Sequence, residues 1–149
     1  MTSADSALDR SVRFAASQRW LLLAAGVLGF GGVLVGSFGA HGLESYLAGR
    51  GYDAELIEKR LDQFDVGARY HLLHSIALLA LASSLPISDR ARRWVGWLLV
   101  AGIALFSGSL YLLVLTNTPW LGAITPLGGL SWIVGWIVLA VAAFRSDRG

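Results

Sequence analysis

The chain has 149 residues, of which 55% are hydrophobic and only 15% are charged, and its formal net charge is +2. This length suits a single domain, and the charged fraction lies well below that of ordinary soluble domains. The small net charge, without a basic patch interleaved with aromatic residues, gives no indication of nucleic-acid binding. The chain contains no cysteine, which excludes disulfides, thiol catalysis and thiolate metal sites.

Charged residues are missing from three long stretches, residues 21–43, 70–88 and 94–144. A bilayer requires such runs, because a helix needs about 20 apolar residues to cross the hydrocarbon core. The sequence therefore predicts an all-α integral membrane protein, a bundle of four transmembrane helices forming one domain over residues 20–144. The predicted spans are residues 20–39, 66–85, 95–115 and 121–144, with tails at residues 1–19 and 145–149.

The first of these spans has two interpretations. Arg13 and Arg19, followed by an apolar stretch and by small residues near Ser37 and Gly39, resemble a secretory signal peptide. The apolar stretch is longer than the usual core of such a peptide. A retained transmembrane helix is therefore the preferred interpretation.

Between the first two spans lies a charged segment with helical periodicity. Ile57, Leu61 and Phe64 recur at helical spacing, and Asp53 is a suitable N-cap. We therefore expect an amphipathic helix over residues 54–65. It either lies on the outer membrane surface or runs directly into the second span.

The orientation follows from the positions of Lys and Arg, because cytoplasmic loops carry an excess of them. Positive residues gather in both tails and in residues 86–94, whereas the connection at residues 116–120 has none. The long segment of residues 40–69 contains more acidic than basic side chains. Both chain ends are therefore expected on the cytoplasmic side of the plasma membrane, the inner membrane where a cell has two.

Small residues line one face of the first and of the last predicted span. They are Gly32, Gly36 and Gly39 in the first span, and Gly128, Ser131 and Gly135 in the fourth. The pair Gly32-x-x-x-Gly36 is typical of helices whose backbones approach closely in lipid. Close packing within the bundle or an oligomer is the favoured interpretation, and a pore lined by small residues is the alternative.

All three histidines of the chain lie in or beside the predicted spans. His41 follows the first span, and His71 and His74 share one face at the start of the second. The predicted topology brings them to the same leaflet, so they could converge. The candidate cluster for a polar path or a ligand consists of His41, His71, His74, Arg69, Tyr70 and Glu44.

Three interpretations of this cluster remain open: structural hydrogen bonding, a path for protons or polar solutes, and a metal or haem site. Ionisable groups within a membrane are costly and are usually functional. Imidazoles titrate near neutral pH, and three of them suffice to ligate a metal. The metal is left unspecified and no cofactor is expected. For His74 we expect an interior position with a hydrogen bond to Ser37, Ser107 or Ser109, since lipid cannot replace a lost partner.

Four motifs, taken in order, resemble those of one family. They are residues 36–43 (GSFGAHGL), 64–74 (FDVGARYHLLH), 106–111 (FSGSLY) and 124–129 (ITPLGG). Together they resemble a family of small bacterial membrane proteins, domain of unknown function 423, that is similar to eukaryotic transmembrane protein 256. The resemblance covers about residues 20–145 and implies four spans. It implies no activity, substrate or cofactor.

No nucleotide-binding, nucleophile or dinucleotide signature is found. We therefore predict a non-enzymatic membrane protein of unknown function, either a small channel or transporter or a subunit of a larger membrane complex. Its expected partners are the lipid bilayer and, since four spans are few for a solute path, further copies or a larger complex. The alternative hypothesis is a metal- or haem-binding membrane protein, a possible metalloenzyme, that uses His41, His71 and His74.

Overall fold

The computed structural model describes residues 3–83 and 85–146, with side chains described from Gln18 to Arg145 except at residue 84. All regular structure in these residues is helical, which confirms the all-α prediction for this part of the chain. The helices are α1 (Ser3–His41), α2 (Leu43–Gly49), α3 (Ala54–Leu81), α4 (Asp89–Gly102), the π-helix η1 (Ile103–Ser107), α5 (Gly108–Thr116), the 3-10 helix η2 (Pro119–Ala123) and α6 (Thr125–Ser146).

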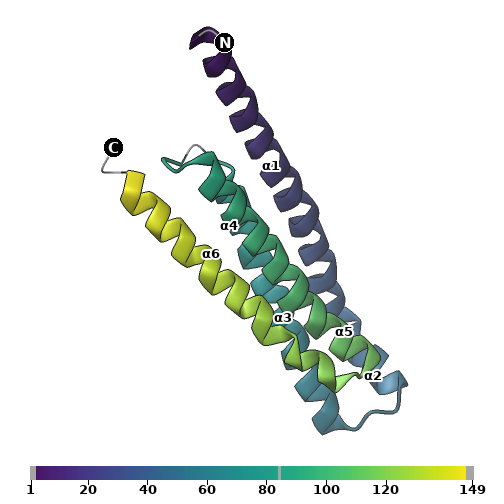
Figure 1. Cartoon of the computed structure of the whole chain (residues 1–149). Coiled ribbons are helices and arrows are strands. Elements are labelled where there is room, and N and C mark those ends of the chain that lie inside the picture. The colour runs from purple at the N-terminus through teal and green to yellow at the C-terminus, as the bar shows by residue number, and fades with distance from the viewer. Residues whose placement is uncertain (1–2, 84, 147–149) are drawn as a thin grey trace.

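The long helices run alongside one another as a bundle (Figure 1). α3 packs along α1, α6 packs along α4 and η1, and α3 also contacts η1 and α5. α1 and α6 therefore lie on the two flanks of the bundle. The first turns of α1, the last turns of α6 and the α3–α4 connection lie at one end, called the tail end below. α2 and the α5–α6 connection lie at the opposite end, called the α2 end.

Within the described residues, three helical stretches are long and apolar enough to cross a membrane: Gln18–His41, Asp89–Thr116 and Pro119–Arg145. They correspond to the first, third and fourth predicted spans. α3 is not among them, because its two histidines and its charged residues lower its mean hydropathy. Length and composition thus support three of the four predicted spans.

α3 joins the charged segment and the second predicted span in one continuous helix. It begins after Asp53, whose side-chain carboxylate accepts a hydrogen bond of 2.8 Å from the Leu56 amide as an N-cap. It then continues without a break through Gly67 to Leu81. The predicted amphipathic segment therefore continues directly into the helix of the second predicted span, which ends at Leu81 and not at residue 85.

A buried arginine from α4 explains why α3 ends at Leu81. Arg92 is fully buried, and its guanidinium donates hydrogen bonds to the carbonyls of Leu81, Ser83 and Leu85 at 2.6, 2.6 and 2.9 Å. Carbonyl groups at a helix C-terminus lack intrahelical partners and attract cations. Arg92 therefore stabilises both the end of α3 and the connection to α4.

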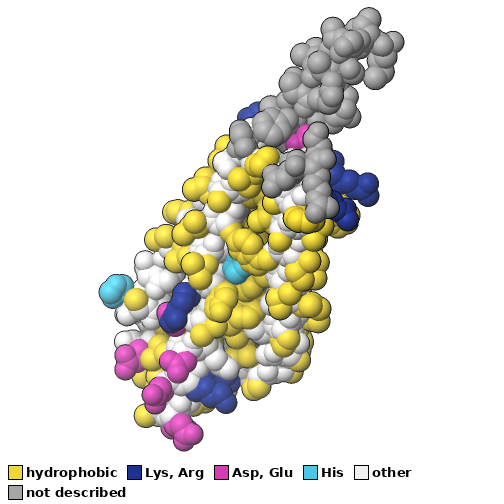
Figure 2. Space-filling view, turned by 90° about the vertical axis from the view of Figure 1, so that its left-hand side faces the viewer, with side chains coloured by type: hydrophobic (Ala, Val, Ile, Leu, Met, Phe, Trp, Pro, Cys, Tyr) yellow, Lys and Arg dark blue, Asp and Glu magenta, His cyan; other side chains and the backbone are white. Residues whose placement is uncertain are grey.

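Two apolar clusters fill the interior. The tail-end cluster consists of Leu21, Ala25, Leu78, Leu81, Ala82, Val95, Leu99, Ile103 and Trp132. The α2-end cluster consists of Leu43, Leu47, Phe64, Leu113 and Val114. On the outer surface, Figure 2 shows hydrophobic side chains over the middle of one face and acidic side chains gathered toward its lower end. This distribution suits a molecule with a central membrane-facing belt.

Candidate functional site

The structure divides the six residues of the predicted cluster between the surface and the interior. His41, Glu44, Arg69 and Tyr70 are exposed, and Arg69 forms an ion pair with Asp65. His71 and His74 are each only 7% exposed. The three imidazoles therefore do not converge, because His41 lies at the exposed end of α1. Among the described residues, no group of three or more His, Cys, Asp or Glu side chains is arranged to hold a metal ion.

His71 forms a buried pair with Tyr111 of α5. The Nδ1 atom of His71 lies 3.2 Å from the Tyr111 hydroxyl oxygen. The opposite edge of the imidazole faces α1, where Cβ atoms added at Gly31 and Gly32 would lie 4.0 and 3.6 Å from its ring carbons. The two glycines thus leave the space that the imidazole occupies between α1 and α5.

Ser107, the last residue of η1, extends this pair. It lies one helical turn before Tyr111 and is fully buried. Its hydroxyl interacts with Tyr111 without reaching the geometry of a standard hydrogen bond. We call His71, Tyr111 and Ser107 the polar line. It connects α3 with α5 and η1 through groups that are expensive to bury without partners.

His74 faces the interior as predicted, but none of the three predicted serines is its partner. Its Nδ1 atom lies 2.8 Å from the carbonyl oxygen of Tyr70, one turn earlier in α3. Its ring stacks on Trp132 of α6, with the ring centroids 3.7 Å apart and the planes 4° from parallel. The helix backbone and an aromatic face therefore provide the contacts that a serine hydroxyl was expected to provide.

Trp132 holds an aromatic layer around His74. The indole is buried, and its Nε1 donates a hydrogen bond to the Leu99 carbonyl at 3.1 Å. Phe106 and Tyr70 pack on it, with ring centroids 4.8 and 5.7 Å away. A Cβ atom at Gly102 would overlap the indole, so this glycine is required for its position. Trp132 was not among the predicted site residues, although a mid-span tryptophan needs an N–H partner within the bundle.

The small residues of α6 lie against α4 and η1. A Cβ atom at Gly128 would lie 2.8 Å from the Cα atom of Phe106, so the two backbones touch here. Ser131 donates a hydrogen bond of 2.8 Å to the Leu98 carbonyl. A Cβ atom at Gly135 would lie 3.4 Å from the Cβ atom of Leu98. All three residues therefore face the neighbouring helix.

The small residues of α1 do not all face α3. Cβ atoms at Gly32 and Gly39 would lie 2.7 Å from Leu72 Cδ2 and 2.9 Å from Phe64 Cδ1. A Cβ atom at Gly36 would meet nothing within 4 Å. The close contact thus repeats seven residues apart, through Gly32 and Gly39, rather than through the predicted Gly32–Gly36 pair.

An acidic recess of about 340 Å³ opens between α1, α2 and α3 near the α2 end. Its lining consists of Gly36, Gly39, Ala40, Glu44, Leu61, Asp62, Phe64, Asp65 and Ala68. Phe64 is buried, and its ring also packs on Tyr111 with the centroids 5.0 Å apart. The Phe64 ring therefore lies between the acidic recess and the polar line.

Long apolar helices around a buried polar interior define a helical membrane protein. The family described as "protein of unknown function (DUF423)" matches residues 35–129, and this chain belongs to that family, as its motifs predicted. The chain is 42% identical over 110 residues to a UPF0382 membrane protein of Staphylococcus saprophyticus, which covers 74% of this chain and 84% of that relative. It is 40% identical over 116 residues to the UPF0382 membrane protein YwdK of Bacillus subtilis, covering 74% and 85% of the two chains. No solved structure is significantly similar.

Proposed function

We propose that this chain is a non-enzymatic proton transporter that spans the plasma membrane four times, with both chain ends in the cytoplasm. The observation that carries the proposal is the buried hydrogen bond between His71 and Tyr111 beside an acidic recess. Ionisable side chains are expensive inside a membrane, and those that occur there commonly mark ion pathways and proton relays. Imidazole and hydroxyl groups in contact are suited to passing a proton.

In this proposal α3 supplies the second of the four spans. Its outward side chains in the second half are apolar, with Leu73, Ile76 and Leu79 exposed by 54%, 63% and 54%. Such side chains suit contact with lipid, whereas His71 and His74 face inward. The low mean hydropathy of α3 therefore comes mainly from residues that lipid does not meet.

The acidic recess is the proposed entrance from the outer side. Carboxylates that line a concave surface raise the local concentration of cations and protons. Phe64 separates this entrance from Tyr111, so movement of one ring would join them. Beyond the polar line, the apolar tail-end cluster closes the inner half of the bundle. The proposed transport is therefore an alternating process. Phe64 first closes the path between the acidic recess and the polar line, and the tail-end cluster then opens the path from the polar line to the inner side.

The competing functions receive less support from the described residues. The outward side chains of α1 and α6 are apolar, as lipid contact requires, and they point to no particular partner subunit. A metal or haem centre would need converging ligands, and the histidines do not converge. His71, Tyr111 and Ser107 lie inside the bundle, which is where a proton path through a single copy of the chain would need polar groups.

Proton movement in liposomes tests the proposal. Wild-type protein reconstituted with an internal pH-sensitive dye should dissipate an imposed pH gradient faster than protein-free vesicles do. Tyr111→Phe removes the hydroxyl that meets His71 but keeps the ring against Phe64, so it should slow the movement. Tyr46→Phe is the matched control, because the Tyr46 hydroxyl donates to the Leu115 carbonyl away from the polar line. A wild-type rate no faster than that of empty vesicles, or an unchanged rate in Tyr111→Phe, would contradict the proposal.

A further inference from the structure

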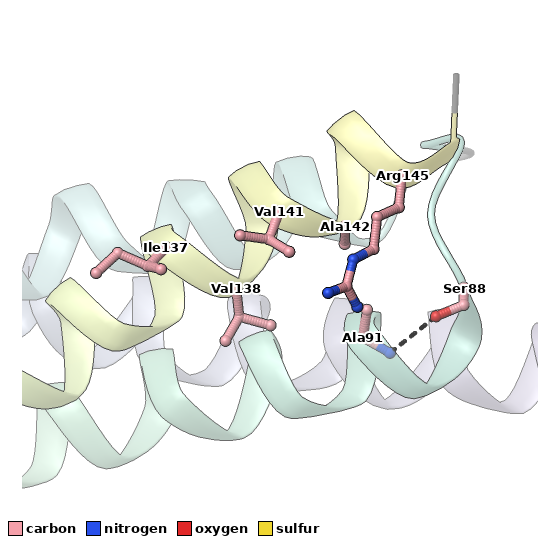
Figure 3. A pocket seen from close by; sticks show the side chains of 7 residues that line it. All are labelled: Ser88, Ala91, Ile137, Val138, Val141, Ala142 and Arg145. Atoms are coloured by element: carbon pink, nitrogen blue, oxygen red, sulfur yellow. Dashed lines mark hydrogen bonds between the residues drawn. The ribbon is translucent and has the colours of Figure 1, made fainter. Parts of the chain in front are cut away.

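A second recess, of about 560 Å³, lies between α4 and α6 at the tail end (Figure 3). It is far along the bundle from the acidic recess and plays no part in the proposed proton path. We call it the α4–α6 groove. Its lining consists of Ser88, Ala91, Ile137, Val138, Val141, Ala142 and Arg145.

The α4–α6 groove has an apolar wall and a polar mouth. Figure 3 shows Ile137, Val138 and Val141 along the wall, and the Arg145 side chain reaching across the mouth toward Ala91 at the start of α4. Ser88 lies at the same mouth, where its hydroxyl accepts a hydrogen bond of 3.3 Å from the Ala91 amide. A guanidinium and the positive end of a helix dipole at one end, with aliphatic side chains below, match an amphipathic anion.

The groove lies at the depth where a lipid headgroup meets its acyl chains. Arg145 is the last residue of the apolar stretch Pro119–Arg145, so the wall descends from the membrane surface into the apolar belt. Trp97 stacks on Trp20 at the same end of the bundle, with ring centroids 5.1 Å apart. Tryptophans of this kind mark the membrane–water interface.

The charged side chains around the groove are mostly positive. Arg90 and Arg93 are exposed on the first turns of α4, where with Trp94 and Trp97 they line a neighbouring recess of about 310 Å³. Asp89, at the start of α4, is the nearby carboxylate in the first turn. The three arginines outnumber it, and basic side chains near a membrane surface attract anionic lipids.

We propose that the α4–α6 groove binds one phospholipid with an anionic headgroup. Its phosphate lies on Arg145, and one acyl chain lies along Ile137, Val138 and Val141. This inference rests on the membrane placement of α6 and is independent of proton transport. A groove with one guanidinium and an aliphatic wall fits a lipid better than a free anion, because a free anion has no acyl chain to contact the wall.

Native mass spectrometry of the full-length protein in detergent tests this proposal. Phosphatidylglycerol should be retained more than phosphatidylcholine with the same acyl chains. Arg145→Gln should weaken phosphatidylglycerol retention roughly fivefold, the effect expected for one basic side chain at an anionic lipid. Arg50→Gln removes the same charge from an exposed position at the α2 end, away from the groove, and should leave retention nearly unchanged. Equal losses in the two variants, or equal retention of the two lipids by the wild type, would overturn the site.

The apolar wall is tested separately. Val141→Trp places a bulky ring in the groove at an exposed position, so folding should be preserved while both lipids are lost. Soluble glycerol phosphate should displace neither lipid, because it lacks the acyl chain that the wall holds. Displacement by glycerol phosphate, or full lipid retention in Val141→Trp, would show that the groove is not a lipid site.

Discussion

Two buried arginines connect the ends of α3 to neighbouring elements of the bundle. Arg60 donates hydrogen bonds to Gln63 and to Asn117, whose left-handed backbone (φ 50°) ends α5. Arg92 reaches from α4 to the carbonyls at the other end of α3. A guanidinium can serve several acceptors at once because it carries five donors in a fixed plane. Both ends of α3 are thus bonded to the continuous helical stretch that α4, η1 and α5 form.

Arg92→Ala is expected to destabilise the protein strongly. The substitution leaves the carbonyls of Leu81, Ser83 and Leu85 without their shared donor and opens a cavity beside the tail-end cluster. Loss of a buried, charged hydrogen-bonding partner costs about 3 kcal/mol. Thermal or denaturant unfolding of the purified protein in detergent measures the change.

Arg93→Ala is the control for Arg92→Ala, since it removes the same charge from an exposed position one residue away. Its unfolding free energy should stay within about 0.5 kcal/mol of the wild type. Equal destabilisation by both variants would mean that the positive charge of this turn, and not the hydrogen bonds of Arg92, stabilises the fold.

The sequence contains a weak signal for the burial of Arg92. Arg92, Val95 and Leu99 share one helix face, and all three are buried. The excess of arginine in this loop, however, already had a sufficient explanation in the cytoplasmic charge rule. The arginine excess that indicates the membrane orientation therefore gave no separate indication that Arg92 is buried. The sequence could not predict the hydrogen bond of His74 to the Tyr70 carbonyl either. Every helical side chain has a backbone carbonyl one turn earlier within reach, so this kind of bond leaves no pattern in the sequence.

The π-helix η1 interrupts the α-helix of the third predicted span. The Gly108 amide bonds back to the Ile103 carbonyl, which widens the helix by one residue over Ile103–Ser107. α6 meets this wide turn at Gly128, and the absence of a side chain there permits the backbones to touch. η1 also carries Ser107 and Phe106 into the polar line and the aromatic layer. Apolar periodicity cannot reveal a π-turn, because it adds a single residue without changing composition.

Gly128→Ala is expected to destabilise the contact between α6 and η1. The added methyl would meet the Cα and Cβ atoms of Phe106 at 2.8 and 2.7 Å, and backbone atoms cannot move aside as a flexible side chain can. Overpacking of this kind costs about 1–3 kcal/mol. Unfolding in detergent and the near-ultraviolet circular dichroism of the buried Trp132 should both report the change.

Gly36→Ala is the matched control for Gly128→Ala, because the sequence suggested packing roles for both glycines. No atom lies within 4 Å of the added methyl at Gly36, and alanine favours the helix. The variant should be as stable as the wild type or slightly more so. Destabilisation by Gly36→Ala would indicate that another copy of the chain packs on this face of α1.

The number of membrane crossings depends on α3. The sequence predicted its two halves separately, from helical spacing in residues 54–65 and from an apolar run after them. Their fusion into one helix, with charged residues up to Arg69 and mostly apolar residues from Leu72 onward, explains why α3 is less apolar than the other long helices. In Figure 1 the first turns of α1 and the last turns of α6 lie at the same end of the bundle, as the proposed four crossings require.

Cysteine labelling distinguishes four crossings from three. Because the chain has no cysteine, single variants report one site each. Ser45→Cys on α2, Lys59→Cys on α3 and Arg90→Cys on α4 all replace exposed residues. A membrane-impermeant maleimide applied to intact cells should label the first two and reach Arg90→Cys only after the membrane is permeabilised. If α3 does not cross, Lys59→Cys and Arg90→Cys lie on the same side and react alike, since no other span separates them. Equal labelling of these two variants in intact cells would therefore exclude the four-span topology and, with it, an entrance and an exit on opposite sides of the polar line.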